Sequence, residues 1–367
     1  MVEEQVNSKN MSQDSAQNQY DFILYGAYGY TGKLIAELAH KQGLTPLLAG
    51  RKEEPLSQLA ARLNLPYETL GLDAPADLDR LLSKAPIVLH AAGPYSATAQ
   101  PMVEACLRTH THYVDITGEI EVFEWIATQS EPAKQAGVVL LPGAGFDVVP
   151  TDCLAAYVTS GLERPTHLDI VIKSLSSVSR GTALTAVENL GASSYCRVNG
   201  KLTSVDLAHT SRFVDFGKGQ RLAASIPWGD IATAYQSTGV PNIVTYMQTS
   251  PRSYRMMRSA KSWRWLLKAK SVQKFMRKQV NKRITGPTEE VRETANSFVW
   301  AEARNASGAS KTARLTTMEA YKLTALSSLE ATQRISRGEV DAGFHTPATA
   351  FGADFILEFE GSIREDL

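Results

Sequence analysis

The chain has 367 residues, 43% of them apolar, with 38 basic and 38 acidic side chains and a formal net charge of zero. This length predicts two domains, and no uninterrupted apolar run approaches the roughly 18 residues that span a bilayer. The three scattered cysteines, Cys106, Cys153 and Cys196, have neither metal-site spacing nor the pattern of a disulfide framework, so we expect buried thiols and a cytoplasmic protein.

The first residues differ in composition from the rest. Residues 1–19 are rich in Gln, Asn, Ser and acids and lack the apolar region of a signal peptide. This composition predicts a disordered tail.

A glycine-rich turn follows the first apolar run. Phe22–Tyr25 is expected to form a buried strand and Lys33–His40 a helix, and the glycines between them have the spacing G-x-x-G-x-x-G. Such a turn lets backbone N–H groups approach a pyrophosphate, which the helix N-terminus also favours. The predicted binding residues of this turn are Gly26, Tyr28, Gly29, Tyr30, Thr31 and Gly32.

The end of the second strand indicates which dinucleotide binds. Leu47–Ala49 should be this strand, and Gly50, Arg51 and Lys52 follow it without an acid. An acid at this point holds the ribose 2′-hydroxyl of NAD, whereas an arginine accommodates the 2′-phosphate of NADP. Arg51 therefore favours NADP(H), and the alternative is a solvated basic turn.

Strands and helices then alternate as far as Pro150, which predicts an α/β fold with a parallel sheet covered on both faces. The third strand, Tyr67–Leu72, leads to Asp73 on the adenine side of the ligand. The fourth, Pro86–Ala92, leads to a turn where parallel strands end at a ligand crevice; its predicted cofactor contacts are Ala92, Gly93, Pro94 and Tyr95. Further elements are expected as helices at Leu56–Leu63, Ala76–Leu82, Met102–Leu107 and about 121–130, and as strands at Tyr113–Ile116 and Val138–Leu141.

The pattern changes after this point. We expect a nucleotide domain over 20–150 and a mixed α+β substrate domain over 151–367, with an antiparallel sheet. Its predicted elements are strands at Leu168–Ile172, Phe213–Phe216 and Ile243–Met247, and helices at Leu184–Val198 and Thr317–Ser336. The last helix has a pattern that would allow it to pack back on the nucleotide domain.

Two residues are candidates for proton transfer. Tyr95 follows the fourth strand, where its phenol could donate a proton or pack against the cofactor. Asp147 lies in the turn after the sixth strand, where it could act as an acid or brace the turn. No tyrosine has a lysine four residues later, and the seven histidines show no metal-site spacing.

Basic residues are concentrated in one segment. Residues 251–283 contain 12 of the 38 Lys and Arg residues and no Asp or Glu. One face of a predicted basic amphipathic helix contains Met256, Ala260, Trp263 and Leu267, and the helix also contains Trp265. This helix could form a lid, dock on anionic lipid or bind an acidic partner. No nucleic-acid-binding motif accompanies this charge.

Several motifs together resemble a known family. GAYGYTG, AGR, AAGPY, HYVDITGE, GFDVVPTD and PWGD, with the closing AYKLTA and GFHTPATAFGADFILEFEG, resemble the saccharopine dehydrogenase-like oxidoreductases. Within this group the chain is most similar to the trans-acting enoyl reductases, over roughly residues 20–362. The resemblance implies a Rossmann-like domain and NADP(H), and it makes an acyl carrier protein a plausible acidic partner.

These observations lead to one functional hypothesis and two alternatives. We expect an NADPH-dependent reductase of an activated C=C in an acyl or lipid-like substrate. The alternatives are imine reduction of an amino-acid conjugate, as in saccharopine dehydrogenases, and a non-catalytic nucleotide-binding protein at a membrane. The expected location is the cytoplasm or its membrane surface, and a homodimer is compatible with the sequence.

Overall fold

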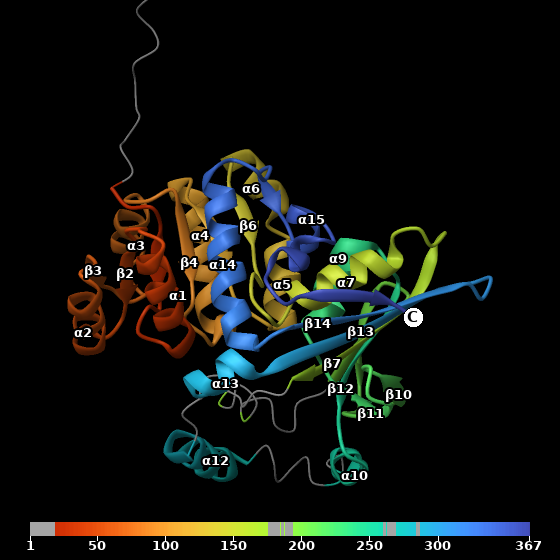
Figure 1. The fold of residues 1–367 in the computed structure, drawn as a ribbon. Helices are drawn as coiled ribbons and strands as arrows, with labels where there is room; N and C mark the ends of the chain where they lie inside the picture. The colour runs from red at the N-terminus through yellow and green to blue at the C-terminus, as the bar shows by residue number, and fades with distance from the viewer. Residues whose placement is uncertain are drawn as a thin grey trace, which may run out of the picture.

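The structure is a computed structural model that describes residues 19–174, 194–259, 269–283 and 287–367, with the single residues 184, 187 and 262 between them. Except for Gln19, the predicted N-terminal tail lies outside the described residues. Of the predicted basic amphipathic helix, Ala260, Trp263, Trp265 and Leu267 also lie outside them. Figure 1 shows two sheets with helices around them.

The first sheet contains seven parallel strands in the order β15-β6-β5-β4-β1-β2-β3. The strand order reverses between β1 and β4, which is the switch point where doubly wound sheets bind ligands. This arrangement confirms the predicted Rossmann-like parallel sheet. The strands are β1 (Ile23–Tyr25), β2 (Leu47–Gly50), β3 (Tyr67–Thr69), β4 (Ile87–His90), β5 (His112–Asp115), β6 (Val139–Leu141) and β15 (Gly343–Phe344).

Side chains alternate between the two faces of this sheet, as the pleat requires. Leu24 and Leu89 pack with helices on one face, whereas Ile23 and Val88 pack on the other. Helices α1 (Tyr30–Lys41), α2 (Glu53–Leu63) and α14 (Ala320–Ser336) cover the first face. Helices α3 (Pro75–Leu82), α4 (Tyr95–Thr109), α5 (Ile120–Ala127) and α6 (Ser130–Ala136) cover the second.

Helix ends follow local chemistry in this half. Helix α2 begins with Glu53 and Glu54, whose charges favour the positive end of the helix dipole, and ends at Asn64 in a left-handed conformation. Helix α6 ends in the same way at Gly137, with φ of 68°. These ends turn the chain back to the next strand.

The second sheet is mixed. Strands β12 and β7 are parallel, while the other described pairs are antiparallel. Its strands are β7 (Pro165–Ser174), β8 (Ser194–Val198), β9 (Lys201–Val205), β10 (Ser211–Asp215), β11 (Gln220–Ser225), β12 (Asn242–Gln248), β13 (Asn296–Asn305), β14 (Ser310–Met318) and β16 (Ile363–Asp366). This sheet confirms the predicted second α+β domain, but the prediction of an antiparallel sheet is wrong for the parallel pair of β7 and β12.

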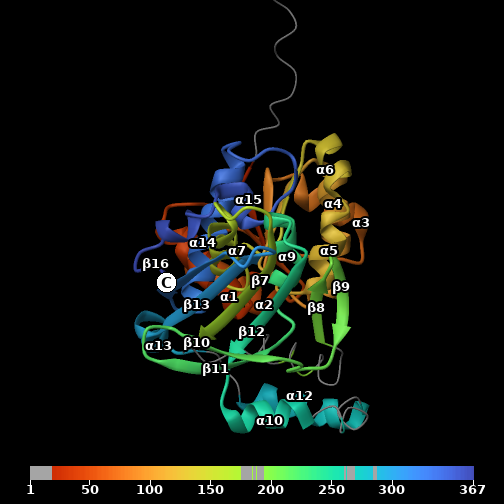
Figure 2. The same cartoon turned by 90° about the vertical axis from the view of Figure 1, so that its right-hand side faces the viewer.

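Further helices join the two sheets or lie outside them. Buried residues of α7 (Val149–Thr159) pack with β7, β13 and β14, and α9 (Asp230–Thr238) lies beside α7. The last segment adds α15 (Pro347–Phe351) and a 3₁₀ turn, η2 (Phe355–Glu358). In Figures 1 and 2, α10 (Pro251–Ser259) and α12 (Lys270–Arg283) lie at one end of the molecule, and α13 (Glu289–Thr294) lies between them and α14.

One predicted helix is wrong in its second part. Ser194–Val198 was expected to be helical but forms β8, which pairs with β9 through a turn at Asn199 and Gly200. Both turn residues have positive φ, 50° and 77°, and Asn-Gly is the strongest signal for a two-residue hairpin. Of the rest of that prediction, the structure describes only residues 184 and 187, and both are helical.

Other boundaries also shift. Thr317 and Met318 belong to β14, so the last long helix begins at Ala320. The helix expected at about 121–130 is two helices, α5 and α6, and the third strand ends at Thr69. Helix α14 lies on the parallel sheet because Ala325, Leu329 and Ile335 pack into its core.

Candidate cofactor and substrate site

The glycine turn lies at the switch point, where it packs on the end of β4. Gly26 has φ of 90°, and a Cβ atom there would lie 2.8 Å from the Ala91 carbonyl carbon. A Cβ on Gly32 would collide with the Gly26 carbonyl oxygen. Only glycine allows this close packing of loop, helix and strand.

The middle glycine, Gly29, leaves the start of α1 open to a ligand. Gly29 is the N-cap of α1, without a side-chain capping bond, and no acidic residue lies in the first turn. An uncapped helix N-terminus offers N–H groups and a positive dipole to a phosphate. The residues present therefore fit the pyrophosphate of a dinucleotide.

Tyr28 and Arg51 lie together at the end of β2. A Cβ on Gly50 would lie 2.6 Å from Cε1 of Tyr28, so the tyrosine ring covers this glycine. The exposed Arg51 follows directly. The next acid along the chain, Glu53, accepts hydrogen bonds from Tyr67 and Thr69 of β3. Arg51 is thus the charged group that β2 places at this edge.

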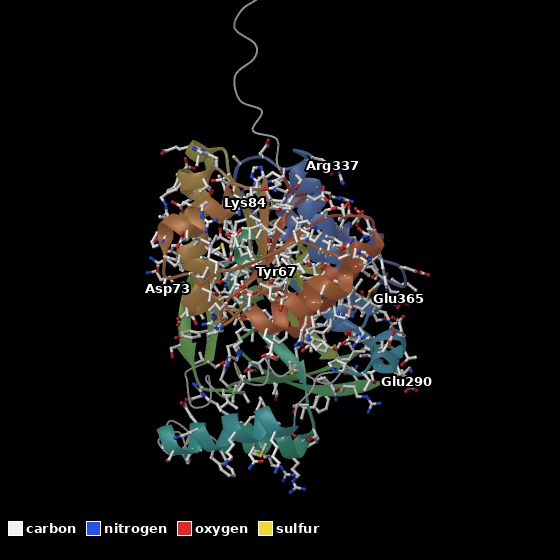
Figure 3. The ribbon with its side chains drawn as sticks, turned by 90° about the vertical axis from the view of Figure 1, so that its left-hand side faces the viewer. Tyr67, Asp73, Lys84, Glu290, Arg337 and Glu365 are labelled. Carbon is white, nitrogen blue, oxygen red and sulfur yellow. The ribbon has the colours of Figure 1, made fainter. Side chains whose placement is uncertain are left out.

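Asp73 lies at the outer edge of the parallel sheet. It is exposed, follows β3, and is labelled at this edge in Figure 3. The Tyr25 hydroxyl donates a hydrogen bond to the Leu70 carbonyl, 2.9 Å away, in the same region. Burial raises the pKa of Tyr25 to about 12, an effect that Arg51 opposes and Asp73 reinforces.

The start of α4 is closed by an acid. Both oxygens of Glu119 accept hydrogen bonds, at 2.8 Å each, from the backbone nitrogens of Tyr95 and Ser96. A carboxylate at a helix N-terminus stabilises the positive end of the dipole. Glu119 therefore fixes the turn that contains Ala92, Gly93 and Pro94, and α1 presents the open helix end at the switch point.

Tyr95 points its hydroxyl into the protein. The side chain is buried, and its hydroxyl donates to the His90 carbonyl at 3.2 Å. Burial raises the pKa of Tyr95 well above its ordinary value. The rings of Tyr25, Tyr95 and Tyr113 surround His90, with centroid distances of 5.3 to 6.0 Å.

His90 is the last residue of β4 and lies directly before the turn that contains Ala92, Gly93 and Pro94. It is fully buried, and its Nδ1 lies 3.3 Å from the Tyr113 hydroxyl, which donates at 2.6 Å to Asp115. Burial lowers the pKa of His90 to about 3, so the ring is neutral at neutral pH. Asp115 also accepts from the backbone nitrogens of Thr117 and Gly143. These groups brace the strand ends.

Asp147 differs from Asp115 in having no hydrogen bond to its carboxylate from any residue that the structure describes. Its side chain lies beside Gly118, where a Cβ atom would be 2.7 Å from Oδ2. Burial raises the pKa of Asp147 to about 6. Trp228 donates a hydrogen bond at 2.8 Å from Nε1 to the Asp147 carbonyl, which fixes the backbone of this turn.

Two further acids lie deeper, between α7 and α9. Asp152 accepts hydrogen bonds from Ser237 and from the Ala348 nitrogen, so it joins three helices. Asp230 is fully buried next to Thr151, and burial raises its pKa well above the ordinary value. Asp147 is the member of this acidic group with partial exposure at the strand-end loops.

Tyr30 and Thr31 form the first turn of α1, but Tyr30 faces the second domain. Its hydroxyl donates to the Pro287 carbonyl at 2.8 Å and accepts from Arg292 at 3.0 Å. Its ring packs on Tyr321, with a centroid distance of 4.9 Å. These contacts of Tyr30 were not predicted from the sequence. No local sequence pattern indicates them, because the partners of Tyr30 are distant along the chain.

The strand order and the glycine turn define an α/β protein with a Rossmann-like parallel sheet and a second, mixed sheet, and the glycine turn lies at the switch point, where such sheets bind ligands. Residues 22–141 match the family described as saccharopine dehydrogenase NADP binding domain. The match covers about a third of the chain, and over these residues the chain is similar to the NADP-binding domain of a family of oxidoreductases.

Curated relatives share part of the sequence. A trans-acting enoyl reductase of Mycobacterium tuberculosis is 32% identical over 195 residues, which cover 49% of this chain and 46% of the relative. A saccharopine dehydrogenase-like oxidoreductase of Bos taurus is 29% identical over 163 residues, 38% of each chain. The matched region thus spans less than half the length of these relatives.

Solved structures share the whole fold. Saccharopine dehydrogenase (L-Glu forming) from Saccharomyces cerevisiae matches with a TM-score of 0.65 and 12% identity, covering 95% of this chain and 100% of that chain. Homospermidine synthase from Legionella pneumophila, solved with NAD, matches with a TM-score of 0.64 and 8% identity, covering 95% and 92%. At this identity the likeness shows the fold alone.

Proposed function

We propose that the protein is an NADPH-dependent reductase of an activated C=C in an acyl or lipid-like substrate, free or bound to a carrier. The main support for NADPH over NADH is the position of Arg51, which directly follows Gly50 at the end of β2 in an NADP-binding domain. The similarity to proteins named enoyl reductases supports the choice of a C=C bond. NADPH, when bound, supplies the hydride.

Each part of the proposed site has a separate task. The backbone at Gly26, Gly29 and Gly32 holds the pyrophosphate, and Arg51 pairs with the 2′-phosphate. Tyr28 and Asp73 lie on the adenine side. The turn from Ala92 to Tyr95, held by Glu119, supports the nicotinamide end at the ends of β4 and β5.

Reduction of a C=C bond also requires a proton at the second carbon. Asp147 suits this task because its carboxyl group accepts no hydrogen bond from a described residue and has a pKa of about 6. Tyr95 is the other candidate, but its hydroxyl is bonded to the His90 carbonyl. We therefore assign the proton to Asp147 and a positioning role to Tyr95.

A coenzyme-consumption screen tests this proposal. Purified protein is mixed with NADPH and either enoyl thioesters or pairs of keto acid and amine, and absorbance of the reduced coenzyme is followed. We expect thioester-dependent oxidation of NADPH, with Gly29→Val as the control variant that cannot bind the coenzyme. Oxidation that requires the amine pair would contradict C=C reduction, and tight binding without oxidation would contradict turnover.

A further inference from the structure

The basic segment 251–283 forms two described helices that carry one sign of charge. Nine of its basic residues lie in α10 and α12, and neither helix contains an acid. The basic residues are Arg252, Arg255, Arg258, Lys270, Lys274, Arg277, Lys278, Lys282 and Arg283. Outside residues 251–283, which hold 12 basic residues, the chain has 26 basic and 38 acidic residues. Positive charge is therefore concentrated in this segment.

Large apolar side chains are exposed on the same helices. Met256 on α10 is 68% exposed and Phe275 on α12 is 61% exposed. Helix α10 has no buried residue at all. Exposed apolar groups among basic ones are typical of helices that lie in a membrane interface, where lysine and arginine meet headgroups and apolar groups enter the acyl boundary.

The two helices lie at one end of the molecule. Figures 1 and 2 show them as a layer beyond β10 and β11, and Figure 3 shows their side chains extending away from the body. Among the residues with described structure, no helix is long and apolar enough to cross a membrane. Contact with a bilayer through these helices would therefore be peripheral.

This end is also connected to the cofactor site. Pro287, which lies shortly after α12, accepts the hydrogen bond of Tyr30 in the first turn of α1, and Arg292 of α13 bonds to the same hydroxyl. The chain that follows α12 thus contacts the first turn of α1.

We propose that α10 and α12 dock the protein on the surface of an anionic lipid bilayer. Charge complementarity and the layered arrangement of two helices favour a flat anionic surface as the occupant. A basic residue near such a surface contributes attraction that salt screens. This docking does not depend on the proposed reductase activity.

Vesicle sedimentation with the full chain tests the docking. We expect binding to phosphatidylcholine vesicles that contain about 30% phosphatidylserine, and little binding to phosphatidylcholine alone. Raising the salt from about 0.1 M to about 0.5 M should release the protein. Equal binding to both vesicles, or binding to neither, would overturn the proposal.

Matched variants locate the surface. The variant Arg255→Gln, Arg258→Gln, Lys274→Gln and Lys278→Gln should lower the partition coefficient about tenfold or more. A control with the same loss of charge, Arg62→Gln, Arg80→Gln, Lys134→Gln and Arg337→Gln, should bind within about twofold of the original protein. Equal losses of vesicle binding in both variants would mean that the net charge of the protein drives binding, and this would overturn docking through α10 and α12.

The exposed apolar groups give a second test. Met256→Ser with Phe275→Ser should weaken vesicle binding while leaving thermal unfolding unchanged, because neither side chain is buried. Unchanged vesicle binding would overturn insertion at the acyl boundary. Binding of an acyl carrier protein without binding of vesicles would overturn the lipid proposal and assign the surface to an acidic protein.

Discussion

The switch point of the parallel sheet and the basic end of the second domain present two different kinds of surface. At the switch point, glycines pack backbone against backbone, and Gly26 and Gly32 leave no room for a side chain. At the basic end, the exposed Met256 and Phe275 lie on helices that contain basic residues and no acid. Recognition of a coenzyme requires a fixed backbone shape, whereas contact with a charged surface requires only charge and exposure.

This contrast predicts that the largest single effect comes from a glycine. Gly29→Val should abolish measurable NADPH binding, because the side chain would occupy the open start of α1. Its Cβ would lie 3.2 Å from the Gly26 oxygen, a contact that small shifts can relieve. Titration of coenzyme fluorescence measures the loss.

A glycine outside the site provides the control. Gly338 has φ of 75° with open space around a Cβ atom, so Gly338→Ala should cost about 1 kcal/mol of stability and leave NADPH binding unchanged. If Gly29→Val binds NADPH normally, the backbone at the glycine turn is not the coenzyme site.

Removal of the proposed proton donor should have the next largest effect. Asp147→Asn should lower kcat/KM by roughly 10²- to 10³-fold, the usual contribution of a general acid, with NADPH binding unchanged. In the original protein, kcat/KM should fall as pH rises above about 6, because the protonated carboxyl is needed. An Asn variant with the same rate and pH profile would exclude Asp147.

Charge at the end of β2 should determine which coenzyme binds. Arg51→Asp should raise the Kd for NADPH by about 30- to 100-fold and change that for NADH little, since charged hydrogen bonds contribute about 2–3 kcal/mol. Lys52→Asp is the neighbouring control and should have a smaller effect. Equal weakening of both coenzymes by Arg51→Asp would remove the argument for the 2′-phosphate.

The ionised carboxylate of Asp147 should also lower the free energy of unfolding above about pH 6. Its folded pKa of about 6 lies above the unfolded value near 3.9, so the folded state binds the extra proton between about pH 4 and pH 6. Stability therefore falls as pH rises through this window. Asp147→Asn should gain about 1–2 kcal/mol at pH 8 and little near pH 3.5, as chemical denaturation at both pH values can show.

The smallest effect is expected from Tyr95→Phe. The lost hydroxyl bonds to the buried His90 carbonyl and to the backbone of Ile116, so stability should fall by about 1 kcal/mol and turnover by less than about threefold. Thermal unfolding and initial rates measure the two effects. A loss of about a hundredfold or more in kcat would return Tyr95 to the role of proton donor.

The two domains also differ in how far the sequence predicts them. Leu24, Leu89 and Val114 belong to short apolar runs bounded by turns, and such local patterns identify a parallel sheet. The glycine turn and Arg51 could be proposed as coenzyme contacts from the sequence because both lie within one βαβ unit. The capping of α4 by Glu119 was not predicted, because this bond joins residues that follow two neighbouring strands, β4 and β5.

The second domain depends on contacts between distant residues. Phe298 pairs with Lys173, and Phe344 adds β15 beside Leu140 of the parallel sheet. No local periodicity reports such pairings. The hairpin at Asn199 and Gly200 is different, because an Asn-Gly dipeptide is a local sequence signal for a hairpin. The prediction of a helix over this segment did not take that signal into account.

The central claim is that the switch point holds NADP(H) through the glycine turn and Arg51. Calorimetric titration of the purified protein with NADPH and NADH tests it most directly. The account predicts saturable NADPH binding in the micromolar range, at least about tenfold tighter than NADH. No binding of either nucleotide at about 1 mM would contradict it.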